Sequence, residues 1–374
     1  MPFCYAPWSN IDISPQGGIT PCCKFRPEKY NEAPKNINTS TFDEYKNSRV
    51  LKIVQEDFEA GLWPAGCERC RIEEENGILS KRQLDYERWN EQYQSYDRSG
   101  WLTASLAFGN TCNLSCITCG PGSSSRWQQE HQARYNIDIR PNHFYKQGFV
   151  DEFLKNAPGL LHLDIPGGEP FLSGVREQIE LLHRLIESGR SQDISIHYTT
   201  NVTIFPDERW WELWKNFKEI DMQLSIDGVG THNEYIRFPS QWDDVSRHIS
   251  LYQEKQQALT NFRLSISHTV SAYNIFYVPD FFVWCQKQGL PRPWLGRVHT
   301  PIHMRPSVWK NEAKSHIVDR LKNSDNSDCQ AWANLLEHSD DGSYYSQFVD
   351  AVRWHDQYRG LDFKKTFPEM ARFI

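Results

Sequence analysis

The feature that most constrains the fold is an alternation of short apolar strands with amphipathic helices, which begins at Trp101. The segments expected to be strands are 102–108, 161–165, 194–199, 220–226, 262–269 and 293–298. Segments with helical spacing of apolar residues follow at about 171–186, 207–218, 243–256 and 278–288. Consecutive parallel strands need a long crossover, usually a helix. The pattern therefore predicts an α/β fold with a parallel sheet, either open or curled into part of a barrel.

The segments on either side of this alternation differ from it. Turn residues at 14–18 between Ile13 and Ile19 predict a small hairpin. Thr41 and Glu44 fit a capping box that starts a helix ending near Gly61. Residues 71–100 are strongly polar and predict a surface helix and a linker, and the chain from about 311 is expected to be mainly helical.

Composition excludes several classes of protein. Lys and Arg number 41 against 48 Asp and Glu, and the net charge of -7 argues against a general nucleic-acid binder. No apolar run approaches the roughly 18 residues of a membrane helix, so no membrane association is expected. The first residues lack the basic and apolar regions of a secretory signal, which predicts a cytoplasmic location.

The ten cysteines are concentrated before residue 120, and in a reducing compartment such clustering indicates metal or redox chemistry. Cys112, Cys116 and Cys119 have the spacing C-x3-C-x2-C directly after the first expected strand. Three thiolates can hold three irons of a 4Fe–4S cluster and leave the fourth iron open for chemistry. The competing interpretation of this triplet is a zinc site or three structural cysteines.

Glycines and polar residues also lie at or after the ends of the later strands. Ligand sites of parallel β/α folds gather at the carboxyl ends of the strands, so these positions are candidate binding residues. They are Gly167, Gly168, Glu169, Asn201, Ser225, Asp227 and Arg237.

Together these motifs resemble the radical S-adenosylmethionine (radical SAM) superfamily over about residues 101–300. One departure is Thr118, where that family often has an aromatic residue. The resemblance implies a partial (β/α)6 TIM-like barrel, a 4Fe–4S cluster on the cysteine triplet and S-adenosyl-L-methionine (SAM) on the open iron. It further implies that SAM is cleaved to a 5′-deoxyadenosyl radical, which abstracts hydrogen from an unidentified small-molecule or peptide substrate. A flavodoxin or ferredoxin would donate the electron.

The resemblance also implies roles for the strand-end residues. The two glycines permit close approach of the backbone, and Glu169 would accept a hydrogen bond from the SAM ammonium. Ser225 and Asp227 would bind the ribose, Arg237 would pair with the SAM carboxylate, and Asn201 matches a family strand ending. Ordinary turn chemistry and surface ion pairs are the competing interpretations.

Four further cysteines resemble the ligands of a twitch domain, a shortened SPASM domain that holds an auxiliary 4Fe–4S cluster. They are Cys4, Cys22, Cys67 and Cys70. The family's twitch domain usually follows the barrel, whereas here it would precede it. Cys23 competes with Cys22 as a ligand, and the Pro21-Cys22 step favours Cys22. A four-cysteine zinc site is the alternative.

These inferences predict a twitch-like auxiliary-cluster domain at 1–98, a radical SAM partial barrel at 99–310 and a helical C-terminal extension at 311–374. The expected reaction is oxidation or rearrangement of an unactivated carbon. Redox-neutral epimerisation of a sugar or peptide residue is the first alternative. A thiol would then return hydrogen, and Cys285 is the candidate donor, with Cys23 and Cys329 as others. The second alternative is a non-enzymatic binding protein stabilised by zinc or a cluster.

Overall fold

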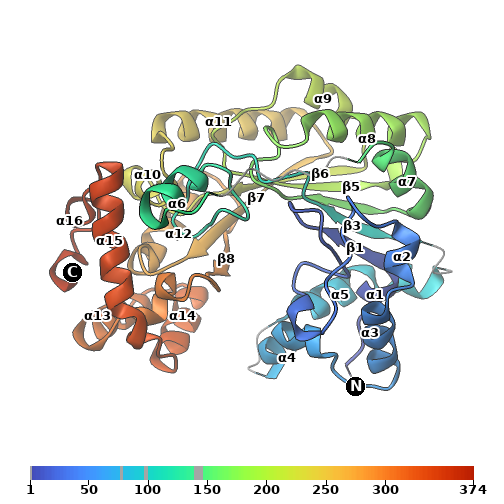
Figure 1. Ribbon diagram of the computed structural model, residues 1–374. Helices are drawn as coiled ribbons and strands as arrows, with labels where there is room; N and C mark the ends of the chain where they lie inside the picture. The colour runs from blue at the N-terminus through green and yellow to red at the C-terminus, as the bar shows by residue number, and fades with distance from the viewer. Residues whose placement is uncertain (1, 76–78, 97–99, 139–145) are drawn as a thin grey trace. The chain divides into compact units, whose positions relative to one another are not determined.

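The computed structural model describes residues 2–75, 79–96, 100–138 and 146–374 (Figure 1). The chain divides into two compact units. The first comprises Met1–Cys112, Pro121–Thr199 and Pro206–Asp221, and the second comprises Asn113–Gly120, Thr200–Phe205 and Met222–Ile374. The domain boundary predicted at 98/99 lies outside the described residues. Within the described ranges, no helix has both the length and the apolar character needed to cross a bilayer.

The first unit is built on a mostly parallel sheet, as the alternation predicts. Its strands are β1 (Asn10–Ile13), β2 (Ile19–Thr20), β3 (Thr103–Leu106), β4 (His162–Ile165) and β5 (Ser195–Thr200), in the order β2-β1-β3-β4-β5. The antiparallel β1–β2 pair confirms the predicted hairpin, and Gly17 takes the positive φ of 82° that its turn requires. β1 also pairs in parallel with β3, which the sequence did not predict.

The helices of the first unit lie on both sides of this sheet. They are α1 (Ala6–Ser9), α2 (Phe42–Lys46), α3 (Arg49–Glu59), α4 (Glu68–Glu75), α5 (Lys81–Ser95), α6 (Trp127–Tyr135), α7 (Phe149–Asn156), α8 (Val175–Glu187) and α9 (Glu208–Trp214). Figure 1 shows α7 and α8 on one side of the strands, with α1, α3 and α5 on the other. The Thr41–Glu44 capping box is confirmed. The helix it starts ends at Lys46, because Ser48 caps a new helix by accepting from the Leu51 N–H.

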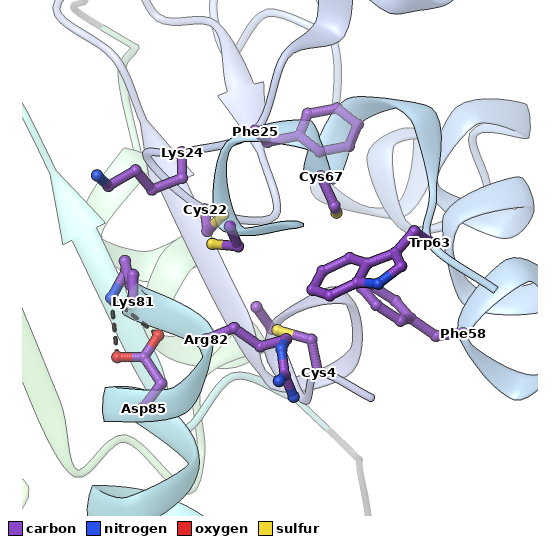
Figure 2. A pocket seen from close by; sticks show the side chains of 12 residues that line it. Cys4, Cys22, Lys24, Phe25, Phe58, Trp63, Cys67, Lys81, Arg82 and Asp85 are labelled. Atoms are coloured by element: carbon purple, nitrogen blue, oxygen red, sulfur yellow. Dashed lines mark hydrogen bonds and ion pairs between the residues drawn. The ribbon is translucent and has the colours of Figure 1, made fainter. Parts of the chain in front are cut away.

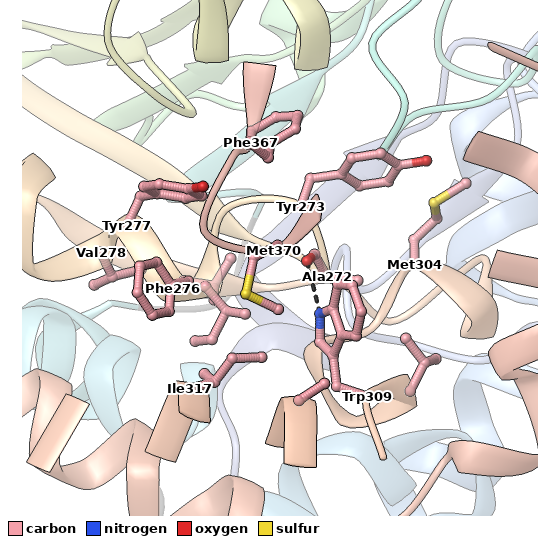
Figure 3. Close-up of a cluster of buried hydrophobic side chains, with 14 of the residues drawn as sticks. Ala272, Tyr273, Phe276, Tyr277, Val278, Met304, Trp309, Ile317, Phe367 and Met370 are labelled. Carbon is pink, nitrogen blue, oxygen red and sulfur yellow. Dashed lines mark hydrogen bonds between the residues drawn. The ribbon is translucent and has the colours of Figure 1, made fainter. Parts of the chain in front are cut away.

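The second unit combines parallel strands with the C-terminal helices. β6 (Glu219–Ser225) has residues in both units, and β7 (Phe262–Val270) pairs in parallel with β8 (Trp294–Arg297). The helices are α10 (Thr231–Ile236), α11 (Trp242–Ala258), α12 (Val278–Lys287), α13 (Asn311–Lys322), α14 (Ser327–Glu337), α15 (Tyr345–Arg359) and α16 (Phe363–Thr366). Figure 3 shows Phe367 and Met370 in one core with Tyr273 and Trp309, whose indole N–H donates to the Ala272 carbonyl at 2.8 Å. The C-terminal segment therefore completes this core.

Candidate metal and cofactor sites

Four of the predicted ligand cysteines line one cavity in the first unit (Figure 2). Cys4 precedes α1 and Cys22 follows β2, so the hairpin region supplies two thiols. Cys67 lies in the short turn before α4, and Cys70 lies in the first turn of α4. Cys23 is not among the lining residues. The structure thus brings together the four thiols that the resemblance implied, although segments of more than forty residues separate the two pairs.

The cavity strongly disfavours free thiolates. Burial raises the pKa of Cys4 to about 12 and raises those of Cys22, Cys67 and Cys70 as well. Neighbouring thiols raise the pKa of Cys22 and Cys67 further. Because thiolates are the form that binds metal, a bound cationic centre would be needed to hold them ionised. Lys24, Lys81 and Arg82 supply positive charge around the same cavity.

The lysine and the arginine at the start of α5 each form an ion pair. Lys81 forms an ion pair with Asp85 at 2.8 Å, and Arg82 pairs with Glu74 at 2.6 Å. The Arg82 guanidinium also donates to the Phe3 carbonyl, next to Cys4. Four thiols with flanking cations have the donor chemistry of a thiolate metal centre. In the described part of the chain, no group of three or more His, Cys, Asp or Glu side chains is already placed to hold a metal ion.

In the first unit, the Gly167–Pro170 turn lies directly against the loop segment that leads from β3 to Cys112. Gly168 donates to the Gly109 carbonyl at 3.2 Å, and Glu169 donates to the Thr111 carbonyl at 2.9 Å. A Cβ on Gly168 would lie 2.3 Å from that Thr111 oxygen, so only glycine fits here. Glu169 is fully buried. Hydrogen bonds therefore fix the Gly167–Pro170 turn and the segment before Cys112 to each other.

The segment 113–120, which carries the other two triplet cysteines, is held by backbone hydrogen bonds in the second unit. The Ser115 N–H donates to the Phe238 carbonyl at 2.7 Å, and the Ile117 N–H donates to the Ile236 carbonyl at 2.9 Å. In addition, the Cys119 N–H donates to the Cys116 carbonyl at 2.9 Å. These contacts fix the path of the loop.

Two side chains brace the same segment from outside it. The Asn201 amide donates to the side-chain oxygen of Asn113 at 2.9 Å. The Arg359 guanidinium, from α15, donates to the Ser115 carbonyl at 2.7 Å and lies 5.0 Å from the Phe238 ring centre. Sequence reasoning singled out Asn201 but missed Arg359, because no local motif marks an arginine near the end of a C-terminal helix.

Asp227 and Arg237 form an ion pair with each other. The Arg237 Nε lies 2.9 Å from one carboxylate oxygen of the fully buried Asp227, and the Thr269 N–H donates to the other at 2.7 Å. Ser225 is half-buried at the end of β6. The two side chains for which the resemblance implies separate contacts with SAM therefore form one buried ion pair at the strand ends.

The candidate hydrogen-donor thiols differ in their access to solvent. Cys285 on α12 and Cys329 on α14 are buried, and burial raises the pKa of Cys285 to about 12. Neither thiol presents a surface that a substrate could contact. Cys23 is exposed, and its electrostatic neighbours are Lys81, Asp12 and Asp164.

The face of the first unit's sheet on the α5 side is polar. Alternate positions such as Ile11, Ile13 and Leu163 are apolar and buried, whereas the other positions are polar. They are Asn10, Asp12, Thr103, Ser105, His162, Asp164, Ser195 and His197. Tyr93 and Trp89 of α5 contact this face. Bulky branched side chains usually fill the interior of parallel β/α barrels, so polar residues here indicate a surface made for solvent or a ligand.

One row of this face crosses four strands. Strand register pairs Asp12 with Ser105, Ser105 with Asp164, and Asp164 with His197. The Ser105 hydroxyl donates to Asp164 at 3.2 Å, and His197 Nδ1 lies 2.8 Å from an Asp221 oxygen. Burial raises the pKa of Asp12 to about 6 and also raises that of Asp164. Burial alone would lower the pKa of His197, but Asp221 and Asp164 raise it overall.

We expect Asp12→Asn to stabilise the chain at alkaline pH. The folded pKa of Asp12, about 6, exceeds the value of about 3.9 in unfolded chains. The folded state therefore holds the proton more tightly, and stability falls as pH rises through that window. Asparagine removes this penalty, so the variant should gain about 1 kcal/mol at pH 8 and less at pH 5. Urea unfolding at both pH values measures this, with exposed Asp244→Asn as the control. An equal gain at both pH values would contradict it.

Comparisons with known proteins give distant similarities. No family model matches the chain, and no curated protein matches it. Native anSMEcpe with bound AdoMet aligns at 17% identity and a TM-score of 0.43, covering 59% of each chain. Streptococcus suis SuiB bound to S-adenosylmethionine aligns at 14% identity and a TM-score of 0.36, covering 91% of this chain and 70% of that one. The matched region thus spans about three fifths of the length of anSMEcpe.

Proposed function

We propose that the chain is a radical SAM enzyme with an auxiliary cluster. The observation that carries the proposal is the cysteine triplet on the loop after β3, with the Gly167–Pro170 turn hydrogen-bonded to Gly109 and Thr111 of the segment that leads from β3 to Cys112. In parallel β/α folds this edge is where ligands bind. The donor set of three thiolates on one short loop suits a cluster with an open iron.

Each named residue then has a definite task. Cys112, Cys116 and Cys119 would ligate the catalytic cluster, which when bound supplies the electron that cleaves SAM. Gly168 allows the backbone to lie against the loop without a side-chain clash. Glu169, buried on that turn, would accept hydrogen bonds from the SAM ammonium. Asn201 holds the side chain of Asn113, and Arg359 holds the backbone carbonyl of Ser115, so that the loop needs little rearrangement.

The N-terminal cavity would hold the second 4Fe–4S cluster. With four thiolates this cluster would be closed to substrate, which suits electron transfer out of a substrate radical. Oxidation or rearrangement of an unactivated carbon is therefore the proposed chemistry, with a flavodoxin or ferredoxin as the proposed electron donor.

Reductive cleavage of SAM tests the proposal. The anaerobically reconstituted protein, mixed with SAM and dithionite, should form 5′-deoxyadenosine and methionine in equal amounts, measured by chromatography. Glu169→Gln keeps the size of the buried side chain but removes its charge, and should weaken SAM binding by about tenfold or more. Iron-loaded protein that forms no 5′-deoxyadenosine would refute the enzyme and leave a cluster- or zinc-stabilised binding protein.

Epimerisation is the second candidate, and the exposure of Cys23 beside Asp12 and Asp164 favours it. Cys23, rather than the buried Cys285, would return a hydrogen atom to the substrate carbon. The resulting thiyl radical would regain one electron from the protein donor and one proton from solvent. Deuterium from heavy water should then enter the product without net oxidation, and Cys23→Ala should abolish that incorporation.

A further inference from the structure

We propose that the polar row of the first unit's sheet binds an amine-bearing polar ligand, with an ammonium group held by Asp12 and Asp164. The row consists of Asp12, Ser105, Asp164 and His197 on four neighbouring strands. This proposal adds a substrate class to the proposed function. The binding of an amine does not depend on that function, but the description of the amine as a substrate does. Nothing in the cysteine sites is needed for the binding itself.

The geometry brings the two carboxylates toward a common point. Strands in a sheet lie about 4.8 Å apart, so Asp12 and Asp164 flank Ser105 on its two neighbours. The Ser105 side chain hydrogen-bonds with both carboxyl groups. An ammonium group has three donors, so it can bond to both carboxylates at once. Hydroxyl groups of the same ligand would find partners at Ser105 and His197.

Charge balance around the row selects a cation. Asp221 is paired with His197, and Lys81 with Asp85 at 2.8 Å. Asp12 and Asp164 form no ion pair within the described ranges. Burial raises the pKa of both carboxyl groups, although Lys81 acts on both, and His197 on Asp164, in the opposite direction. Lys81 is an electrostatic neighbour of both, but Asp85 holds its ammonium. A cationic ligand would supply the missing charge, whereas a neutral or anionic ligand would leave two carboxylates uncompensated.

The row is accessible to a ligand. Asp12, Ser105 and Asp164 are half-buried, and the side chains of His197 and Asp221 are 19% and 31% exposed. Asp12 and Asp164 are partly withdrawn from water, so an ion pair formed here would be stronger than one on an open surface.

Direct binding to the full-length protein tests the proposal without SAM turnover. The cluster-loaded chain, kept free of reductant, would be titrated with glucosamine, N-acetylglucosamine and spermidine by calorimetry and saturation-transfer NMR. Glucosamine and spermidine should bind saturably, and the N-acetyl sugar, which lacks the charge, should bind about tenfold or more weakly. Asp12→Asn and Asp164→Asn should each reduce the affinity for both amines by a similar factor. Asp244→Asn, an exposed carboxylate on α11, should leave it unchanged.

Thermal unfolding of each variant serves as the folding control, since a transition temperature equal to that of the parent excludes unfolding as the cause of lost binding. Removal of a buried carboxylate with a raised pKa should preserve or raise the stability of the folded chain. Equal affinity for glucosamine and its N-acetyl form would overturn the proposal, as would amine binding that survives both substitutions or no saturable amine binding at all. Amine binding without SAM cleavage would support the site and refute the proposed radical function. SAM cleavage without amine binding would refute the site alone.

Discussion

Simultaneous replacement of Cys112, Cys116 and Cys119 by alanine should abolish formation of 5′-deoxyadenosine and remove about four iron atoms per chain. The reconstituted parent should hold about eight, in two 4Fe–4S clusters. The open iron that would bind SAM depends on these three thiolates alone, so its loss should reduce cleavage to background. Iron and sulfide assays on the anaerobic proteins, with chromatography of the SAM products, measure both effects.

The buried thiols provide a matched control. Cys285→Ala removes a thiol but touches neither proposed cluster site, and should leave iron content and SAM cleavage unchanged. About four iron atoms in the parent and none in the triple variant would mean that the N-terminal cysteines hold zinc or nothing. Absence of iron from both proteins would refute the enzyme altogether.

Cys22→Ala should remove about four iron atoms, whereas Cys23→Ala should retain all eight. The two residues are adjacent in sequence, but only Cys22 lines the cavity with Cys4, Cys67 and Cys70. A closed cluster depends on all four ligands, so loss of one should cost most of its occupancy. The comparison is sensitive because both variants delete one thiol within the same turn.

Metal analysis of this pair also separates a cluster from zinc. A zinc site would give about one zinc per chain in the parent, lost in Cys22→Ala and kept in Cys23→Ala. If Cys23→Ala lost the metal and Cys22→Ala kept it, the ligand assignment would be reversed. Equal loss in both variants would contradict the assignment of Cys22 as the one ligand from this turn.

The parallel sheet could be predicted because its strands carry their own signal. Each expected strand from 102 to 298 coincides with an observed one within a few residues, since apolar alternation and flanking turns are local properties. The parallel pairing of β1 with β3 could not be predicted in this way. It joins segments about ninety residues apart, and nothing in the short sequence Asn10–Ile13 specifies its partner.

In the candidate sites, too, some features could be predicted from local sequence, whereas others depend on how distant segments pack. The spacing of Cys112, Cys116 and Cys119 grouped them directly, whereas the four N-terminal cysteines were grouped by their resemblance to the ligands of a twitch domain. The brace from Arg359 could not be found, since it depends on where α15 packs. The polar row left a usable signal, Asn-Ile-Asp-Ile in β1 and His-Leu-Asp-Ile in β4. Such alternation is unusual for parallel strands covered on both faces, which read as continuous apolar runs.

The bond from Arg359 to Ser115 also bears on how the protein is made. It joins residues 244 positions apart. At 5–20 residues per second, a ribosome needs roughly 10 to 50 s to add that length of chain. During this interval the segment 113–120 emerges without its C-terminal brace. The cavity formed by Cys4, Cys22, Cys67 and Cys70 draws its thiols from the first seventy residues. Metal loading of the nascent chain should therefore favour the N-terminal cavity, and the triplet should reach its final form only once α15 with Arg359 has been synthesised and has packed.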